Sequence, residues 1–269
     1  MSYLADYHMH CDLSFDCRTL MEDMAEASAA AGLDEVCFTD HVDLYASGET
    51  EPLSHDFSRR AGVYAAARQR MGDRLVIRQG VELGEPARDP ARADALLREL
   101  GDLDFVIASC HQLPEPYGWQ DLYYCAAQDE AAARQQIRDY LPQLLATARW
   151  GHFSVLGHIT LPLRYMNENN GLRMSFDGFE TEMEQIFRTL IENGCGIECN
   201  TNRGHDPLPG GKWLKLYRAL GGEIVTLGSD AHSTNYAGCF IRERQELLRE
   251  SGFRYFCTFE NRKPIFHKL

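Results

Sequence analysis

The stretch Asp6–Tyr7–His8–Met9–His10 (DYHMH), close to the N-terminus, begins the pattern that decides the fold. Successive side chains of a strand point to opposite faces, so His8 and His10 would point the same way and could hold one metal ion together. Such a pair is by itself a weak indication of a metal site, because two histidines on a strand are commonly buried and hydrogen-bonded. The indication becomes stronger because His, Asp and Glu recur where later apolar strands end.

Segments with strand and helix patterns alternate along the whole chain. The predicted strands span residues 6–10, 35–39, 75–81, 105–109, 154–156, 196–200 and 223–227. The predicted helices span residues 19–31, 58–71, 90–100, 130–150, 177–192, 212–220 and 242–250. This alternation indicates a parallel sheet. In an open doubly wound sheet, the functional residues would gather at the point where the strand order reverses. A barrel instead brings the carboxyl ends of all its strands to one face. Because His, Asp and Glu follow nearly every predicted strand, the sequence favours a barrel.

Local signals add detail to this organisation. Thr19 and Glu22 have the spacing of a capping box at the start of the first helix. We expect residues 42–57 to form a polar loop, and residues 112–128 to form an aromatic loop that covers a site or packs on the rim of the domain. The extended segment 255–259 is expected to close the sheet edge. No linker, repeat or low-complexity segment divides residues 1–269, which predicts a single domain.

Composition excludes several classes of protein. Of the 269 residues, 44% are hydrophobic and 25% charged, which is typical of a globular chain. The formal net charge of −13 and the absence of a Lys/Arg run argue against nucleic acid as a partner. No apolar stretch approaches the ~20 residues that span a membrane. Nine cysteines without a Cys-x-x-Cys pair, and an N-terminus unlike a signal peptide, predict a reduced, cytoplasmic protein.

Nine residues at or near strand ends are candidate metal ligands. They are His8, His10, Asp16, His41, Glu82, His111, His158, Asp230 and His232. One zinc-type ion takes about four ligands, so this set predicts two or three ions, three if Glu82 bridges two of them. Mixed imidazole and carboxylate ligands suit Zn, Mn or Fe better than Ca or Mg.

Metal ions held close together are suited to the hydrolysis of phosphoesters. They lower the pKa of bound water, so that hydroxide can serve as the nucleophile, and they neutralise charge on the phosphoryl oxygens. A small phosphorylated molecule is therefore the expected partner.

The ordered set of motifs resembles the PHP (polymerase and histidinol phosphatase) superfamily, and within it the histidinol-phosphate phosphatases. The motifs are His8–Met9–His10, Thr39–Asp40–His41, Glu82, Ser109–Cys110–His111, Gly157–His158 and Gly228–Ser229–Asp230–Ala231–His232. This resemblance implies a distorted (β/α)7 TIM-like barrel with a trinuclear centre. The implied ligand groups are His8, His10, Glu82 and Asp230; Glu82, His111 and His158; and Asp16, His41 and His232. The family often has His at the position of Asp16.

The resemblance also implies an activity, the hydrolysis of L-histidinol phosphate in histidine biosynthesis. Arg164 and Arg203 resemble phosphate-binding positions of the family, because a guanidinium matches phosphate geometry; surface salt bridges are the alternative. Other possible functions are a phosphoesterase for another small phosphomonoester or a nucleotide, an accessory domain on nucleic acid, and metal storage. The sequence leaves the oligomeric state open.

Overall fold

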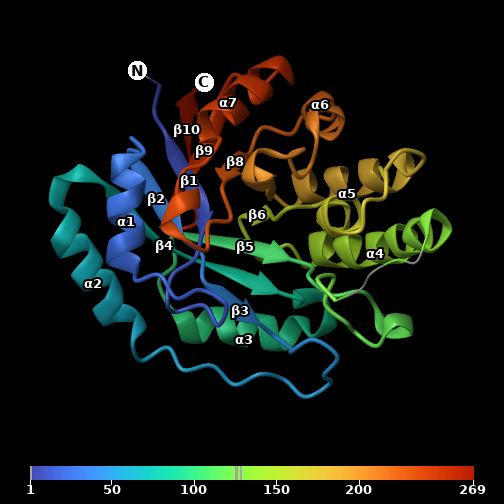
Figure 1. Ribbon diagram of the computed structural model, residues 1–269, viewed down its shortest axis with the longest axis horizontal. Coiled ribbons are helices and arrows are strands. Elements are labelled where there is room, and N and C mark those ends of the chain that lie inside the picture. Colours follow the sequence, from blue (N-terminus) through green and yellow to red (C-terminus); the bar gives the residue numbers. More distant parts are fainter. Residues whose placement is uncertain (1, 125–126, 128) are drawn as a thin grey trace.

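The computed structural model describes residues 2–124, 127 and 129–269 and shows a nearly closed barrel of seven parallel strands (Figure 1). The seven strands are β1 (Ala5–Met9), β2 (Glu35–Phe38), β4 (Val76–Gly84), β5 (Phe105–Ser109), β6 (Val155–Leu156), β7 (Gly196–Asn200) and β8 (Val225–Gly228), and an additional short strand, β3 (His41–Asp43), pairs with β4. Their order is β1-β2-β4-β5-β6-β7-β8, and the short strand β3 continues the path of β2 along β4. The predicted α/β barrel is confirmed.

The barrel closes between its first and last strands. The backbone N–H of Asp230 donates to the carbonyl of His8 (2.7 Å), and that of His10 donates to the carbonyl of Ala231 (2.9 Å). Met9 and Ala231 form an isolated parallel bridge at the same place. Because β1 and β8 are joined in this way, the open doubly wound sheet is excluded.

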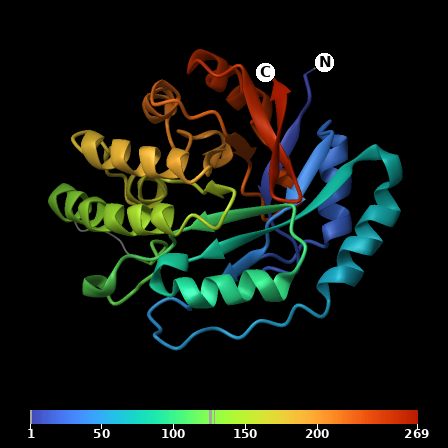
Figure 2. The same cartoon turned by 180° about the vertical axis from the view of Figure 1, so that it is seen from behind.

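Within the described residues, seven α-helices form the outer layer, most of them between successive strands (Figures 1 and 2). They are α1 (Met21–Ala30), α2 (Arg60–Met71), α3 (Pro90–Leu100), α4 (Glu130–Trp150), α5 (Glu180–Glu192), α6 (Gly211–Ala219) and α7 (Ile241–Glu250). Each turns an apolar stripe inward, as α5 does with Met183, Ile186, Phe187 and Leu190. None of the helices in the described part of the chain has the length and apolar character needed to cross a membrane.

The capping box predicted at Thr19 is wrong. Helix α1 begins at Met21, and Leu20, at its N-cap position, makes no side-chain capping hydrogen bond. Met21 and Met24 are buried, and packing of these side chains sets where the helix begins. Thr19 therefore lies outside the helix.

The C-terminal segment does not close the sheet edge, which corrects the second local expectation. Strands β9 (Tyr255–Glu260) and β10 (Lys263–Lys268) form a separate antiparallel hairpin. Because β1 and β8 are already joined, the barrel offers these strands no free edge, and the hairpin packs across the amino ends of the barrel strands (Figure 2). There the N–H of Phe259 donates to Tyr7 Oη (2.8 Å), and the N–H of Arg262 donates to the carbonyl of Asp104 (2.9 Å).

The pairing of β1 with β2 contains an irregularity between Asp6 and Met9. Asp6 pairs with Val36 and Met9 pairs with Phe38, so β1 has one residue more than β2 between these pairs. The Tyr7 ring lies 5.0 Å from that of Phe105 in β5, and His8 Nε2 lies 3.2 Å from Glu82 Oε2 in β4.

Candidate metal centre

The predicted ligands come together at the end of the barrel where the strands finish. His8 lies near the end of β1, Glu82 near the end of β4 and His41 at the start of β3. The loops that follow strands β1, β5, β6 and β8 contribute His10, Asp16, His111, His158, Asp230 and His232. The carboxyl ends of parallel barrel strands converge on one face, which explains why residues so distant in sequence meet here.

Glu82 is the centre of the cluster. Its side chain is fully buried, and Oε1 lies 2.9 Å from His111 Nε2 and 2.7 Å from His158 Nε2. Its second oxygen, Oε2, lies 3.2 Å from His8 Nε2 and 3.1 Å from His41 Nδ1. One carboxylate is therefore approached by histidines from four segments, the geometry expected of a group that bridges ions.

Two further carboxylates complete the arrangement. Asp230 Oδ1 lies 3.4 Å from His10 Nε2, and Asp16 Oδ2 lies 3.0 Å from His232 Nε2. Asp16 Oδ2 is also 3.5 Å from His41 Nε2. The described residues thus contain four compact donor groups suited to metal ions: His8, His10 and Glu82; Glu82, His111 and His158; His10, Asp16, His41 and His232; and His41, Asp43 and His111.

Unpaired polar atoms show that these residues fit metal ions. Within the described part of the chain, His8 Nε2, His10 Nε2 and Glu82 Oε2 are buried and have no hydrogen-bond partner. The other ring nitrogens are occupied, since His8 Nδ1 lies 2.6 Å from Glu198 Oε1 and His10 Nδ1 lies 3.0 Å from Ser14 Oγ. Buried polar atoms without partners are costly, and a cation among them would remove that cost.

The electrostatics also favour ionised ligands. Burial alone would raise the pKa of Glu82, but the charges of His8, His111 and His41 outweigh it and hold that pKa well below its usual range. Burial likewise opposes ionisation of Asp230, and His8 and Arg164 lower the pKa of this carboxyl well below its ordinary value. Both carboxylates are therefore negatively charged and available to a cation.

Three acidic residues near the centre were missed by the sequence analysis. Asp43 falls at the start of the predicted polar loop, yet it belongs to β3, and its Oδ1 lies 3.5 Å from His111 Nδ1. Its spacing of two residues from His41 on an extended segment was the available signal. Glu198 is a buried charge in the apolar run Gly196–Asn200, which also predicts a nearby partner. Glu85 accepts hydrogen bonds from the backbone N–H groups of His111 (2.5 Å) and Gln112 (3.0 Å), and no sequence pattern indicates this role.

The two arginines differ in position. Arg164 begins a π-helical turn (Arg164–Asn169), lines the cavity beside the cluster, and donates from Nη1 to Asp230 Oδ2 (2.8 Å). Arg203 is exposed and lies with its guanidinium carbon 5.0 Å from the centre of the Tyr236 ring, outside the residues that line this cavity. Arg164 is therefore placed beside the candidate ligands, and Arg203 is not.

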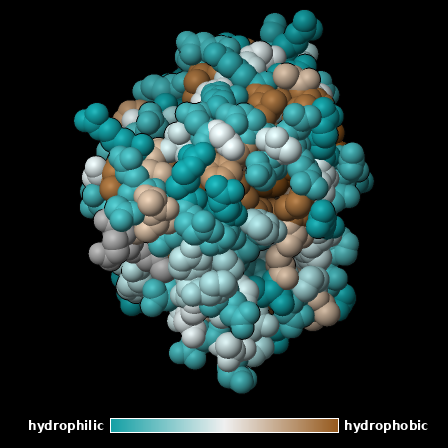
Figure 3. Space-filling view, turned by 90° about the vertical axis from the view of Figure 1, so that its right-hand side faces the viewer, coloured by the Kyte–Doolittle hydropathy of each residue, from teal (hydrophilic) through white to brown (hydrophobic). Residues whose placement is uncertain are grey.

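The cluster lies in a cavity of about 670 Å³ at the carboxyl ends of the strands. Figure 3 shows the side toward which β4 and β5 point, where apolar atoms gather around a hollow. The described part of the aromatic loop contributes Tyr123 and Tyr124 to the cavity wall, and residues 125, 126 and 128 of that predicted loop lie outside the described residues. The loop thus borders the site.

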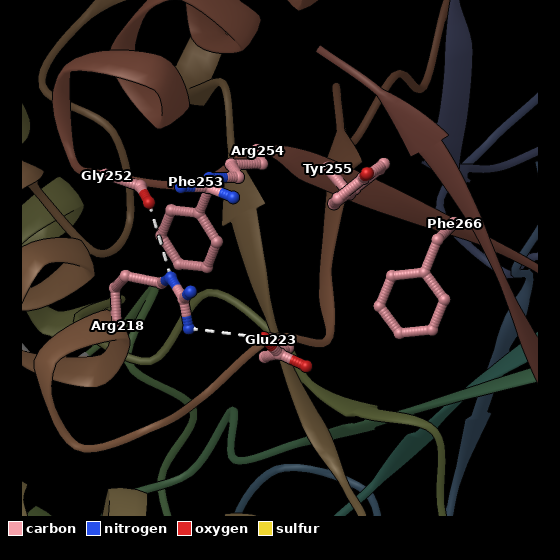
Figure 4. A pocket seen from close by; sticks show the side chains of 7 residues that line it. All are labelled: Arg218, Glu223, Gly252, Phe253, Arg254, Tyr255 and Phe266. Atoms are coloured by element: carbon pink, nitrogen blue, oxygen red, sulfur yellow. Dashed lines mark hydrogen bonds and ion pairs between the residues drawn. The ribbon is translucent and has the colours of Figure 1, made fainter.

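A second hollow, of about 660 Å³, lies beside the C-terminal hairpin (Figure 4). Its wall includes Arg218, whose Nε donates to the carbonyl of Gly252 (3.3 Å) and whose Nη1 lies 3.5 Å from Glu223. The aromatic side chains of Phe253, Tyr255 and Phe266 complete most of the lining. None of the nine candidate ligands lines it, so the strand-end cavity is the better candidate site.

The fold and the site define a class: α/β-barrel proteins with a histidine–carboxylate centre, suited to metal ions, at the carboxyl ends of the strands. Residues 6–202 match the PHP domain, and the chain belongs to this family. The match ends before Asp230 and His232, which the barrel closure brings back to the other candidate ligands.

Named relatives cover nearly the full length of the chain. A histidinol-phosphatase of Lactococcus lactis is 28% identical over 268 residues, covering 96% of this chain and 95% of the relative. A probable histidinol-phosphatase of Thermotoga maritima is 26% identical, covering 99% and 100%. The crystal structure of a histidinol phosphate phosphatase from Lactococcus lactis, complexed with zinc, L-histidinol and phosphate, superimposes with a TM-score of 0.80 at 23% identity, covering 97% and 98%. This last likeness establishes the common fold.

Proposed function

We propose that the protein is a metal-dependent phosphomonoesterase that hydrolyses L-histidinol phosphate to L-histidinol and phosphate. The observation that carries the reaction class is the fully buried Glu82, which four histidines approach in a family of phosphoesterases. The full-length similarity to histidinol-phosphatases supports the substrate.

The proposed ligands are the nine residues predicted from the sequence, and the proposed ions are two or three of Zn, Mn or Fe. One group would be His8, His10, Glu82 and Asp230; a second would be Glu82, His111 and His158; and a third would be Asp16, His41 and His232. The short distances within each group support this division. The crystal structure of the Lactococcus lactis relative contains zinc, which supports that metal for this chain.

Divalent ions bound here would lower the pKa of a water molecule and offset the negative charge of a phosphoryl group. The chain itself orients the ligands, since Glu198 fixes the His8 ring through Nδ1 and also accepts from the backbone N–H of His158 (2.7 Å). Arg164 lies at the cavity wall, where it donates to Asp230 and to Asn202 Oδ1 (2.8 Å), and its proposed role is to bind phosphate oxygens. Arg203 is proposed as a second phosphate contact on the resemblance alone.

We also propose a cytoplasmic location. Eight cysteines within the described residues are free, and seven of them are buried. Unpaired thiols are typical of a reducing compartment.

The decisive experiment is steady-state phosphate release from L-histidinol phosphate, with the metal content determined on the same sample. Efficient release that stops on EDTA treatment and returns with zinc or manganese is expected. Metal-loaded protein that leaves L-histidinol phosphate intact but cleaves a nucleotide or sugar phosphate would refute the substrate. Loaded protein that cleaves no phosphomonoester would refute the reaction class.

A further inference from the structure

Three polar groups surround the hydroxyl of Ser14, in the loop between β1 and α1. Ser14 Oγ lies 3.0 Å from His10 Nδ1, and it accepts a hydrogen bond from the backbone N–H of His41 (3.0 Å). Asp40 Oδ1 lies 3.0 Å from the same hydroxyl and also accepts from the backbone N–H of Cys11 (2.7 Å). Ser14, His10 and Asp40 are buried, so these groups must satisfy one another without bulk water.

The direction of each hydrogen bond follows from the atoms that meet at Ser14. Asp40 Oδ1 is an acceptor, since it receives the Cys11 N–H. The Ser14 hydroxyl proton therefore points to Asp40, because the opposite arrangement would place two acceptor oxygens 3.0 Å apart with no proton between them. The hydroxyl oxygen keeps two lone pairs, and one of them receives the His41 N–H. The other lone pair can only accept, so His10 Nδ1 is the donor.

This direction of donation assigns the tautomer of His10. With the proton on Nδ1, the free lone pair of the ring lies on Nε2, which is buried and has no hydrogen-bond partner among the described residues. The rings of His41 and His232 stack on that of His10, with centroids 4.4 and 4.0 Å away, and hold its plane. His10 Nε2 lies 3.6 Å from Glu82 Oε2 and 3.4 Å from Asp230 Oδ1. A lone pair that faces two carboxylate oxygens is repelled by them unless a cation lies between.

We propose that Ser14 and Asp40 are positioning residues that hold His10 in its Nδ1–H tautomer and so direct the lone pair of Nε2 to a divalent cation. Asp40 acts on His10 through the Ser14 hydroxyl, although it is next to His41 in the sequence. The inference rests on the proposed metal-dependent function. The tautomer is nevertheless a property of the chain itself and can be measured with and without metal.

The test determines the His10 tautomer by nitrogen-15 NMR at neutral pH, on the full-length protein loaded with zinc and after zinc removal. We expect the proton on Nδ1 in both forms of the wild type. Ser14→Ala should give a mixture of tautomers in the metal-free protein and lower zinc affinity about 10- to 100-fold in a competition titration.

Two substitutions of Asp40 test its action through Ser14. Asp40→Ala should shift the proton of His10 to Nε2, because the Ser14 hydroxyl is then free to donate to Nδ1, and zinc affinity should fall with it. Asp40→Asn should keep the wild-type tautomer, since the Cys11 N–H turns the amide oxygen of the asparagine toward Ser14.

Ser28→Ala is the matched control for loss of a buried hydroxyl. Ser28 lies in α1, donates to the carbonyl of Met24 (2.8 Å) and belongs to none of the candidate donor groups. This change should lower the melting temperature and leave the His10 tautomer and the zinc affinity unchanged.

Each outcome decides the inference. The Nδ1–H tautomer in the wild type, with zinc affinity lost in Ser14→Ala but kept in Ser28→Ala, supports it. A proton on His10 Nε2 in the metal-free wild type overturns it, and this measurement needs no variant to fold. Folded Ser14→Ala that binds zinc as tightly as Ser28→Ala also overturns it. Wild type that binds no zinc, manganese or iron overturns both proposals, whereas wild type that binds zinc but cleaves no phosphomonoester overturns only the proposed reaction.

Discussion

Replacing Glu198 by Gln should weaken metal binding without unfolding the barrel. The Glu198 carboxylate accepts two hydrogen bonds at once, from His8 Nδ1 (2.6 Å) through Oε1 and from the N–H of His158 (2.7 Å) through Oε2. A glutamine has one acceptor oxygen and one NH2 group, which can only donate. One of the two donors, His8 Nδ1 or the His158 N–H, would therefore face this NH2 group and lose its hydrogen bond. The His8 ring then loses the partner that turns Nε2 toward Glu82, or the loop at His158 shifts.

The expected loss of metal affinity can be given a magnitude, because Glu198 orients the candidate metal ligand His8. Loss of a residue that orients a metal ligand typically costs about 10- to 100-fold in metal affinity, or roughly 1.4–2.7 kcal/mol. We expect Glu198→Gln to show that loss in a zinc competition titration against a chromophoric chelator, with a parallel loss of activity at limiting zinc. Excess zinc should restore part of the activity.

A matched control separates metal binding from general destabilisation. Glu35 is a buried glutamate at the start of β2 that pairs with Arg78 (3.1 Å) and belongs neither to the lining of the strand-end cavity nor to a candidate donor group. Glu35→Gln should lower the melting temperature and leave zinc affinity unchanged. If folded Glu198→Gln bound zinc as tightly as the wild type, the orienting role of Glu198 would be disproved.

Three further changes test the centre and the fold. Glu82→Ala should abolish metal binding and activity together while circular dichroism stays native, and full turnover by a metal-depleted variant would be contrary evidence. Removal of metal with EDTA should lower the melting temperature by roughly 5–10 °C relative to protein with metal at 100 times its dissociation constant; an equal melting temperature would argue against structural coupling. Tyr7→Phe removes the hydroxyl that joins Glu35 to the Phe259 backbone, and should destabilise the protein by about 1–3 kcal/mol in urea unfolding with activity retained at 25 °C; a variant as stable as the wild type would show that these bonds contribute little.

The barrel and the candidate ligands could be predicted because both follow from short sequence patterns. An apolar strand followed by His, Asp or Glu can be recognised from a few residues, and a parallel barrel brings all such strand ends together. The grouping around Glu82 therefore needed no knowledge of side-chain packing. The ligand roles themselves stay predictions until metal is measured.

The features that sequence reasoning missed depend on contacts between distant segments. The hairpin β9–β10 was placed at a sheet edge because nothing local shows that Asp230 and His8 seal the barrel. In the sequence Glu198 is a single charged residue in an apolar strand, and its partners His8 and His158 belong to distant segments of the chain. The start of α1 at Met21 is set by packing against the barrel, which outweighed the local capping signal of Thr19.

The seal between β1 and β8 also determines when the site can form during synthesis. His8 and His10 leave the ribosome early, but Asp230, whose backbone closes the barrel on His8, is made only after nearly all of the other strands. The nascent chain therefore carries an incomplete set of ligands, and a metal ion captured at that stage would meet only part of its final coordination. Under the proposed function, complete metal loading would therefore follow the pairing of β1 with β8, as a late step in the maturation of the protein.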